Sequence, residues 1–471
     1  MREAAAERIR TMGEQSVWRL LFRFSGPAII SMMVASSYNI VDAIFVGRLG
    51  SEALAALTIV FPLMMIIHAV AIGTGAGAAS FISRRFGAGD NEEANRGAGV
   101  TISITILLGA LFTAIFLPNL EGVLRLFGAT GAILPLANSY MSILITYAVL
   151  AIFPMAIGTI VRAEGNPILS AAVMIVSAVV NIALDPVFIF GIGPIPAMGV
   201  AGAATATVIA RAVGTVILII YFISGRSSFR FRPSYFIPYP RILAEIYRVG
   251  AAAIVQTAAG SIVMALVNRT AASFGFVPLA VLGVVFRAFS FIVMPCVGIG
   301  QGMLPLVGFN FGAKQIARVG EVVIKAGVAC SIWGTVCWVI VMLFPGPIIS
   351  IFNNDLEFLA IGTGAVRIFS LMLFAVGVQI STGFFFQGIG KGLPSLVMAS
   401  ARQVIFLLPF LYILPRVFGL TGLWAVFPVA DGLSIILTLV WTAIQFRKLG
   451  IPLRFRYKQM ELPASTKPDQ D

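Results

Sequence analysis

The sequence contains few charged residues and a single histidine. Asp, Glu, Lys and Arg account for 11% of its 471 residues, whereas about a quarter is usual in a soluble globular domain. This leaves too little charge to cover a water-exposed surface, so a soluble globular protein is excluded. His68 has no acid or thiol at ligand spacing, and we interpret it as a buried, hydrogen-bonded side chain. A membrane-embedded enzyme that depends on histidine, such as one with an HExxH-type motif, is disfavoured for the same reason.

Cysteine is also scarce, and no nucleotide-binding motif is present. The three cysteines lie within apolar runs without metal-ligand spacing: Cys296, Cys330 and Cys337. We expect them to be small packing residues, with no disulfide and no bound metal. Gly390-Lys391 does not complete a phosphate-binding loop, because Phe385 stands in place of the first glycine and Gly392 in place of Ser or Thr. The sequence therefore predicts no cofactor, no ATP-driven step and no catalytic residue, and we expect the chain not to be an enzyme.

Long apolar runs, by contrast, fill most of the chain. Hydrophobic residues make up 59% of it, and runs of roughly twenty residues recur, each long enough to cross about 30 Å of hydrocarbon as a helix. About twelve such runs lie between residues 24 and 446. The first is long and lacks a small-residue cleavage site, which predicts a retained helix and not a signal peptide. The predicted fold is an all-α polytopic membrane protein with twelve transmembrane helices.

The basic residues are distributed on one side of this topology. If the N-terminus is cytoplasmic, the predicted inner segments hold most of the Arg and Lys residues, and the outer loops hold only Arg48, Arg125 and Arg416. This is the positive-inside bias. It predicts a multi-pass protein of the cell (inner or plasma) membrane with both termini in the cytoplasm. The net charge of +13 is explained by topology, and nucleic-acid binding is the poorer interpretation.

The sequence repeats itself at an offset of about 225 residues. Arg23 then aligns with Arg248, and the glycines at 73, 75 and 77 align with those at 298, 300 and 302. Both glycine triplets lie in apolar helices, where such spacing indicates close helix packing. Each copy holds six helices, so both enter the membrane from the same side and are related by an axis along the membrane normal. The predicted organisation is a cytoplasmic N-terminal segment (1–23), an N-terminal six-helix lobe (24–223), a basic cytoplasmic linker (224–248), a C-terminal six-helix lobe (249–446) and a cytoplasmic tail (447–471).

Two carboxylates break the symmetry of this repeat. Asp42 aligns with Val267, and Asp185 aligns near Phe410 or, at an offset of 220, with Ile405, so only the first lobe carries the acids. Each acid lies deep in an apolar run that starts on the cytoplasmic side, roughly 27 Å along a helix. We therefore expect the two carboxylates at similar depth, toward the outer leaflet.

The neighbours of these acids suit a cation site. Tyr38 and Asn39 lie one turn before Asp42, and Asn181 lies one turn before Asp185, spacings that place each on the face of its acid. An intramembrane carboxylate persists where it is protonated, paired or bound to a cation. Carboxylate and amide oxygens suit a proton or Na⁺. The alternative interpretation is that Asp42 is interfacial, close to its helix end, and that Asp185 only caps a break at the next residue, a proline.

The remaining buried polar groups are weaker signals. We interpret most of them as structural partners or snorkelling side chains. They are Arg211, Arg269, Arg287, Arg367, Arg402 and Asp431. Arg211 and Asp431 occupy equivalent positions at an offset of 220, and the sequence leaves open whether they meet across the lobes.

Four segments together carry a resemblance to a known family. They are Tyr38-Asn39-Ile40-Val41-Asp42, Phe86-Gly87-Ala88-Gly89-Asp90, Arg162-Ala163-Glu164-Gly165-Asn166-Pro167 and Asn181-Ile182-Ala183-Leu184-Asp185-Pro186. With them, the chain from about residue 15 to 448 resembles a prokaryotic multidrug and toxic compound extrusion (MATE) transporter. The resemblance implies a V-shaped pair of six-helix bundles that export bulky organic cations by alternating access, in exchange for inward-moving H⁺ or Na⁺.

The resemblance also implies which residues bind the coupling ion. The first-lobe cation site, where Na⁺ is one option, matches Asp42, Asn181, Asp185 and Thr207. The stretch 265–269 holds no acid, so a second-lobe cation site is not expected. The expected partners are small organic cations, the coupling ion and the lipid bilayer, and we expect a monomer.

An alternative from the same superfamily is a flippase for a lipid-linked oligosaccharide or another lipid. Its anionic pyrophosphate would require several arginines along the cavity. Three second-lobe arginines keep this alternative open: Arg287, Arg367 and Arg402.

Overall fold

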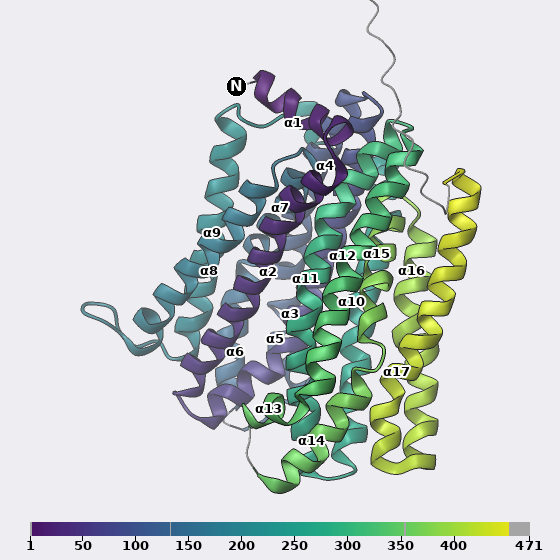
Figure 1. Cartoon of the computed structure of the whole chain (residues 1–471). Helices are drawn as coiled ribbons and strands as arrows, with labels where there is room; N and C mark the ends of the chain where they lie inside the picture. The colour runs from purple at the N-terminus through teal and green to yellow at the C-terminus, as the bar shows by residue number, and fades with distance from the viewer. Residues whose placement is uncertain (1, 132, 353–354, 452–471) are drawn as a thin grey trace, which may run out of the picture.

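The computed structural model describes residues 2–131, 133–352 and 355–451, leaving aside the side chains of residues 2–6, 39, 40, 51 and 399. In these ranges the regular structure is entirely helical. Figure 1 shows two helical bundles side by side, the first in purple to teal and the second in green to yellow, with α1 and the end of α17 at the same face. We call this face, which holds both ends of the described chain, the terminal face.

The first lobe consists of one long helix after another, joined by short turns. Its elements are α1 (Arg2–Glu14), α2 (Val17–Gly47), α3 (Ser51–Gly87), α4 (Asn91–Phe116), α5 (Leu120–Leu126), α6 (Ile133–Thr146), α7 (Ala148–Ala163), α8 (Pro167–Phe190) and α9 (Val200–Ile223). Two of its helices begin with side-chain caps, because Asp90 accepts from the amide of Glu93 and Asn166 from that of Leu169. Such caps satisfy amide groups that have no partner in the first turn.

The second lobe repeats this arrangement after a linker that contains the short 3₁₀ helix η1 (Pro233–Phe236). Its elements are α10 (Pro240–Ala272), α11 (Phe276–Gly312), α12 (Ile316–Leu343), α13 (Pro345–Ser350), α14 (Leu356–Phe369), α15 (Leu373–Gly388), α16 (Gly392–Ser400), the π-helical η2 (Ala401–Leu407) and α17 (Leu408–Leu449). α10 begins at Pro240, so it includes the last residues of the segment predicted as a linker.

Twelve membrane spans follow from these helices, which confirms the predicted architecture. In the described ranges, nine helices are long and apolar enough to cross a membrane, and two bent pairs, α6 with α7 (54°) and α14 with α15 (49°), each make one more span. The last of the nine covers Ala401–Leu449. It divides into two spans at Gly419, whose backbone is not helical (φ 58°, ψ −137°). Gly199 at the start of α9 has nearly the same conformation (φ 56°, ψ −130°), so the repeat extends to the backbone.

The glycine triplets lie at close helix contacts, as predicted, and the outer two glycines of each triplet face a helix of the other lobe. An added Cβ on Gly73 or Gly77 of α3 would come within 2.6 or 2.1 Å of backbone oxygens of α10. An added Cβ on Gly298 or Gly302 of α11 would come within 2.9 or 2.8 Å of backbone atoms of α2. Contacts this short are possible only without a side chain. The lobes are therefore joined backbone to backbone along α3–α10 and α2–α11.

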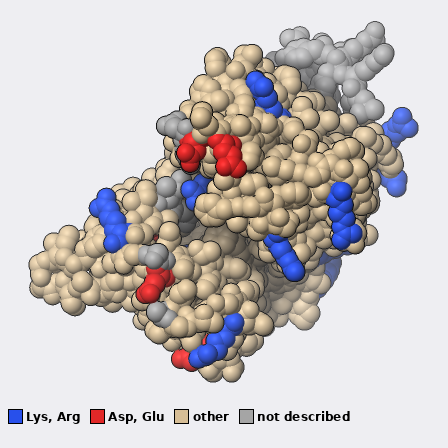
Figure 2. All heavy atoms as spheres, turned by 90° about the horizontal axis from the view of Figure 1, so that it is seen from below, with Lys and Arg blue, Asp and Glu red and all other residues tan. Residues whose placement is uncertain are grey.

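The terminal face is closed by α1 and by the ends of α3 and α11. The backbone oxygen of Met12 accepts a hydrogen bond from Asn310 Nδ2 (3.2 Å), and that of Gln15 accepts one from Arg318 Nη2 (2.8 Å). Arg8 Nη2 donates to the backbone oxygen of Arg226 (2.7 Å). An added Cβ on Gly165 of the first lobe would lie 3.1 Å from the backbone oxygen of Arg8, so α1 contacts both lobes and the linker at this face. Figure 2 shows the opposite face, where the few charged side chains are scattered and the surface is hollowed between the lobes.

Candidate functional site

The first-lobe acids lie on helices that pack against each other. Asp42 is on α2 and Asp185 on α8, and these helices are in contact along their length. Asp185 is fully buried, and its Oδ1 accepts a hydrogen bond from Asn181 Nδ2 (3.2 Å). The same amide group donates to Thr207 Oγ1 on α9 (3.4 Å). The structure therefore brings together Asn181, Asp185 and Thr207, and places Asp42 on the neighbouring helix.

Three oxygens of this cluster accept no hydrogen bond from the described part of the chain. They are Asp42 Oδ1, Asn181 Oδ1 and Asp185 Oδ2, and all three are buried. A buried polar atom without a partner costs about 1–3 kcal/mol. A proton on a carboxylate removes part of this cost, and a bound cation removes more of it. Two carboxylates, an amide and a hydroxyl are also the oxygen ligands that Na⁺ and other hard cations prefer.

Two further side chains, Arg211 and Tyr140, interact with the acids, and a third, His68, contacts Arg211; the predicted site included none of them. The charge of Arg211 acts on Asp42, and Arg211 Nη2 lies 3.4 Å from Nε2 of His68 on α3. Tyr140 of α6 is buried and interacts electrostatically with both acids. Arg211 follows Thr207 by four residues, so helical spacing alone would have placed both on one face of α9.

The two remaining predicted members lie on α2. Tyr38 is half-buried, and its hydroxyl group is within electrostatic range of Tyr140. Asn39 is in the helix, but its side chain lies outside the described residues. The structure gives no hydrogen bond from Tyr38 to Asp42, Asn181, Asp185 or Thr207, and the side chain of Asn39 is not described.

Arg211 and Asp431 do not pair with each other across the lobes. Asp431 pairs with Arg402 inside the second lobe, through a short contact between Nε and Oδ1 and a second one of 3.3 Å between Nη2 and Oδ2. The guanidinium of Arg402 also lies over the ring of Phe289, 5.7 Å from its centroid. In the described second lobe, this acid is paired and is not available for a cation.

We expect Asp431→Asn to lower the thermal stability of the protein strongly. The substitution leaves Arg402 largely buried without its counter-charge, and breaking such a pair typically costs about 3–5 kcal/mol. Thermal unfolding in detergent measures the loss. The double variant Arg402→Met, Asp431→Leu is the control, because it removes both charges and is expected to recover most of the stability. An unchanged melting temperature for Asp431→Asn would contradict the importance of the pair.

A central cavity of about 420 Å³ lies between the lobes. Its flexible apolar lining includes Met32, Met155, Met174, Met294 and Met398. Its polar lining includes five glutamines and two arginines, namely Gln256, Gln301, Gln379, Gln387, Gln403, Arg162 and Arg402, and no carboxylate among the described lining residues. Methionine adapts to ligands of varied shape, so the cavity is suited to drug-sized molecules.

Arg162 is the most buried charge of this cavity. It is 5% exposed, and it donates to Gln301 Oε1 (2.5 Å) and to Ser170 Oγ (3.2 Å). No described carboxylate forms an ion pair with it. The sequence shows Arg162 within a family motif but not that its side chain lines a cavity, because the direction of the side chain depends on how α7 is rotated against α11.

Comparison with known proteins agrees with this architecture. The MatE family model matches residues 27–187 and 252–413, two segments that start 225 positions apart, as the repeat does. The multidrug export protein MepA of Staphylococcus haemolyticus is 27% identical over 418 residues, which cover 88% of this chain and 90% of that protein.

Solved structures give the same result. One, described as an outward-facing conformation of a multidrug resistance MATE family transporter, has a TM-score of 0.88 at 27% identity and covers 94% of this chain and 98% of its own. Another, a transporter of the same superfamily from Pyrococcus furiosus with a binding pocket of reverse polarity, has a TM-score of 0.87 at 27% identity with the same coverage. These relatives are transporters and not enzymes. The chain described here belongs to the MatE family of membrane transporters.

Proposed function

We propose that the chain is a secondary active antiporter that exports organic cations in exchange for H⁺ or Na⁺, with its terminal face in the cytoplasm. The observation that supports this proposal best is the cluster of unpartnered buried oxygens on Asp42, Asn181 and Asp185. Such a cluster gains most from a small cation. The positive-inside distribution of Arg and Lys supports the orientation.

α2 links this cation site to the substrate cavity. It carries Asp42 near one end and the cavity residue Met32 in the middle. Closer to its other end, Ser25 and Ile29 pack against Gly302 and Gly298 of the second lobe. A cation that neutralises Asp42 and Asp185 changes the forces on α2, and α2 contacts both the substrate and the opposite lobe. The bound ion and the bound substrate then change each other's affinity, because each favours one of two conformations of the pair α2 and α11.

The charge of the cavity supports a second cargo, a lipid with an anionic headgroup. Arg162 and Arg402 line the cavity, and of the two only Arg162 has no ion-pair partner among the described residues, since Arg402 is paired with Asp431. A carboxylate to attract an organic cation is lacking among the described lining residues. Of the three arginines that kept the flippase alternative open, Arg402 lines the cavity. Efflux of a cationic dye and translocation of an anionic lipid therefore have to be measured side by side.

Ethidium efflux from cells that express the chain tests the antiporter. A proton gradient and a Na⁺ gradient are imposed separately, and we expect one of them to drive efflux. Reconstituted vesicles with a fluorescent phosphatidylglycerol provide the second arm. Efflux under neither gradient, together with lipid translocation, would reject the drug antiporter in favour of the flippase.

A further inference from the structure

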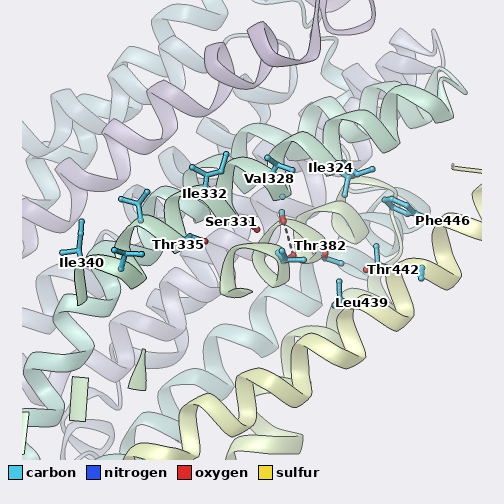
Figure 3. Close-up of a pocket in the computed structure, with 17 residues that line it drawn as sticks. Ile324, Val328, Ser331, Ile332, Thr335, Ile340, Thr382, Leu439, Thr442 and Phe446 are labelled. Carbon is cyan, nitrogen blue, oxygen red and sulfur yellow. Dashed lines mark hydrogen bonds between the residues drawn. The ribbon is translucent and has the colours of Figure 1, made fainter. Parts of the chain in front are cut away.

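The second lobe has an apolar groove on its membrane-facing side, with a volume of about 950 Å³. Figure 3 shows Ile324, Val328 and Ile332 of α12 along one wall and Thr442 and Phe446 of α17 along the other. α15 forms the floor, because both walls pack against it. The groove begins near the terminal face, at Ile324 and Phe446.

The same surface of the first lobe is covered by the linker between the lobes. The amide of Arg230 donates to Asn95 Oδ1 of α4 (3.0 Å), and Ser103 Oγ donates to the backbone oxygen of Phe236 (2.5 Å). Between these two points, an added Cβ on Gly99 would lie 2.5 Å from the backbone oxygen of Tyr235. The linker therefore runs along residues 95, 99 and 103 of α4.

Two aromatic side chains fix the linker against the end of α9. Phe229 packs against Phe86 of α3, with ring centroids 5.6 Å apart. Phe231 packs against Phe222 of α9, with ring centroids 5.3 Å apart. Phe229 is 7% exposed and belongs to the main hydrophobic core. This short aromatic segment closes the gap between α4 and α9 near the terminal face.

The repeat places the groove of the second lobe at the corresponding position. The positions that correspond to 95, 99 and 103 at the offset of 225 are Gly320, Ile324 and Val328. Ile324 and Val328 line the groove, and Val328 is 44% exposed. At the offset of 220 that relates the last helix of each lobe, Phe222 corresponds to Thr442, which also lines the groove. The groove thus starts at the surface that the linker covers in the first lobe.

Four residues of the tail resemble four residues of the linker, with three of the four identical. Phe229-Arg230-Phe231-Arg232 corresponds to Leu453-Arg454-Phe455-Arg456 at an offset of 224. Each segment follows a helix that ends at a left-handed glycine, Gly225 (φ 68°) or Gly450 (φ 71°). We propose that Leu453 and Phe455 of the tail dock in the terminal end of this groove, against Ile324, Val328 and Phe446, as the linker docks on the first lobe.

The last described residue already follows this path. Ile451 is 5% exposed, and an added Cβ on Gly320 would lie 2.4 Å from its Cγ2. From Gly320 to Val328 the distance along the helix is about 12 Å at 1.5 Å per residue. The four residues from Ile451 to Phe455 span up to about 13–14 Å when extended. This length of chain is enough for Phe455 to reach Val328, and basic side chains such as those of Arg454 and Arg456 are favourable at a membrane surface.

Disulfide crosslinking in the full chain tests the docking. The three native cysteines are replaced by alanine, and one cysteine pair, Val328→Cys with Phe455→Cys, is oxidised in membranes with copper phenanthroline and oxygen. Ser103→Cys with Phe236→Cys is the positive control, because these residues are in contact in the first lobe. Leu343→Cys with Phe455→Cys is the negative control, because Leu343 lies at the far end of α12 and is 65% exposed.

We expect the Val328–Phe455 pair to crosslink about tenfold or more faster than the Leu343–Phe455 pair, because docking raises the effective concentration of the two thiols. Equal rates for these two pairs, in a protein whose Ser103–Phe236 pair crosslinks, would overturn the proposal. Native mass spectrometry of the same protein then shows whether a phospholipid occupies the groove in place of the tail. A retained lipid without the crosslink would assign the groove to lipid.

Discussion

The Asp185→Asn variant is expected to reach the membrane folded and to lose about 5- to 150-fold in gradient-driven efflux, the range for a coupling free energy of about 1–3 kcal/mol. Asparagine has nearly the shape of aspartate, so the packing of α8 is kept. It carries no charge and takes up no proton at neutral pH. In the unmodified chain, Asn181 Nδ2 donates to Asp185 Oδ1. If the new asparagine side chain turns its NH₂ group toward Asn181, the NH₂ groups of the two asparagines face each other and that hydrogen bond is lost. The site then no longer distinguishes a bound cation from its absence.

Asp90→Asn is the matched control for this prediction. It makes the same chemical change at the terminal face, where Asp90 caps α4 through the amide of Glu93 (3.1 Å). Asparagine is as good a cap as aspartate, so efflux is expected to stay near that of the unmodified chain. Ethidium efflux is measured for both variants at equal amounts in the membrane, with Asp42→Asn beside them. Normal efflux in the Asp42→Asn, Asp185→Asn double variant would reject this site as the coupling site.

The membrane spans and the repeat were predictable from sequence, because both are patterns along the chain that do not depend on how the helices pack. Twenty apolar residues in a row have one low-energy arrangement in a bilayer, and the offset of 225 aligned Gly50 with Gly275, which share a φ of 121°. The bends between α6 and α7 and between α14 and α15 were not predicted. No proline marks the break at Tyr147 or at Met372, so their cause lies in packing between helices.

The candidate site was predictable only along each helix. Spacing placed Asn181 beside Asp185, and the structure confirms that contact at 3.2 Å. Tyr140 lies near the acids because α6 packs against α9, and nothing in the spacing along the chain reports that packing. His68 was interpreted as a structural side chain, and its partner turns out to be Arg211. Contacts between helices depend on their relative rotation, which the sequence pattern does not determine.

Closure of the terminal face is expected to fail in the Gly77→Ala variant. The added Cβ would lie 2.1 Å from the backbone oxygen of Ile246 and 2.9 Å from its carbonyl carbon. Both are backbone atoms, so α3 and α10 have to separate. Overpacking of this kind costs about 1–3 kcal/mol or more. This cost is present only in the conformation in which α3 and α10 are in contact. A transporter that has to alternate between two conformations then favours the one in which these helices are apart, and efflux falls.

Gly283→Ala is the control that separates this effect from helix propensity. Gly283 lies inside α11, and an added Cβ meets no atom within 4 Å. Alanine in a helix is favoured over glycine by about 0.5–1 kcal/mol. The control is therefore expected to leave the stability of the protein unchanged or to raise it, whereas Gly77→Ala is expected to destabilise the closed conformation. Spin labels at Glu92 and Ala317, equivalent exposed positions of the two lobes at the terminal face, measure the separation directly. We expect longer distances in Gly77→Ala and unchanged distances in Gly283→Ala. The same distances in both variants would mean that close contact between α3 and α10 does not hold the terminal face closed.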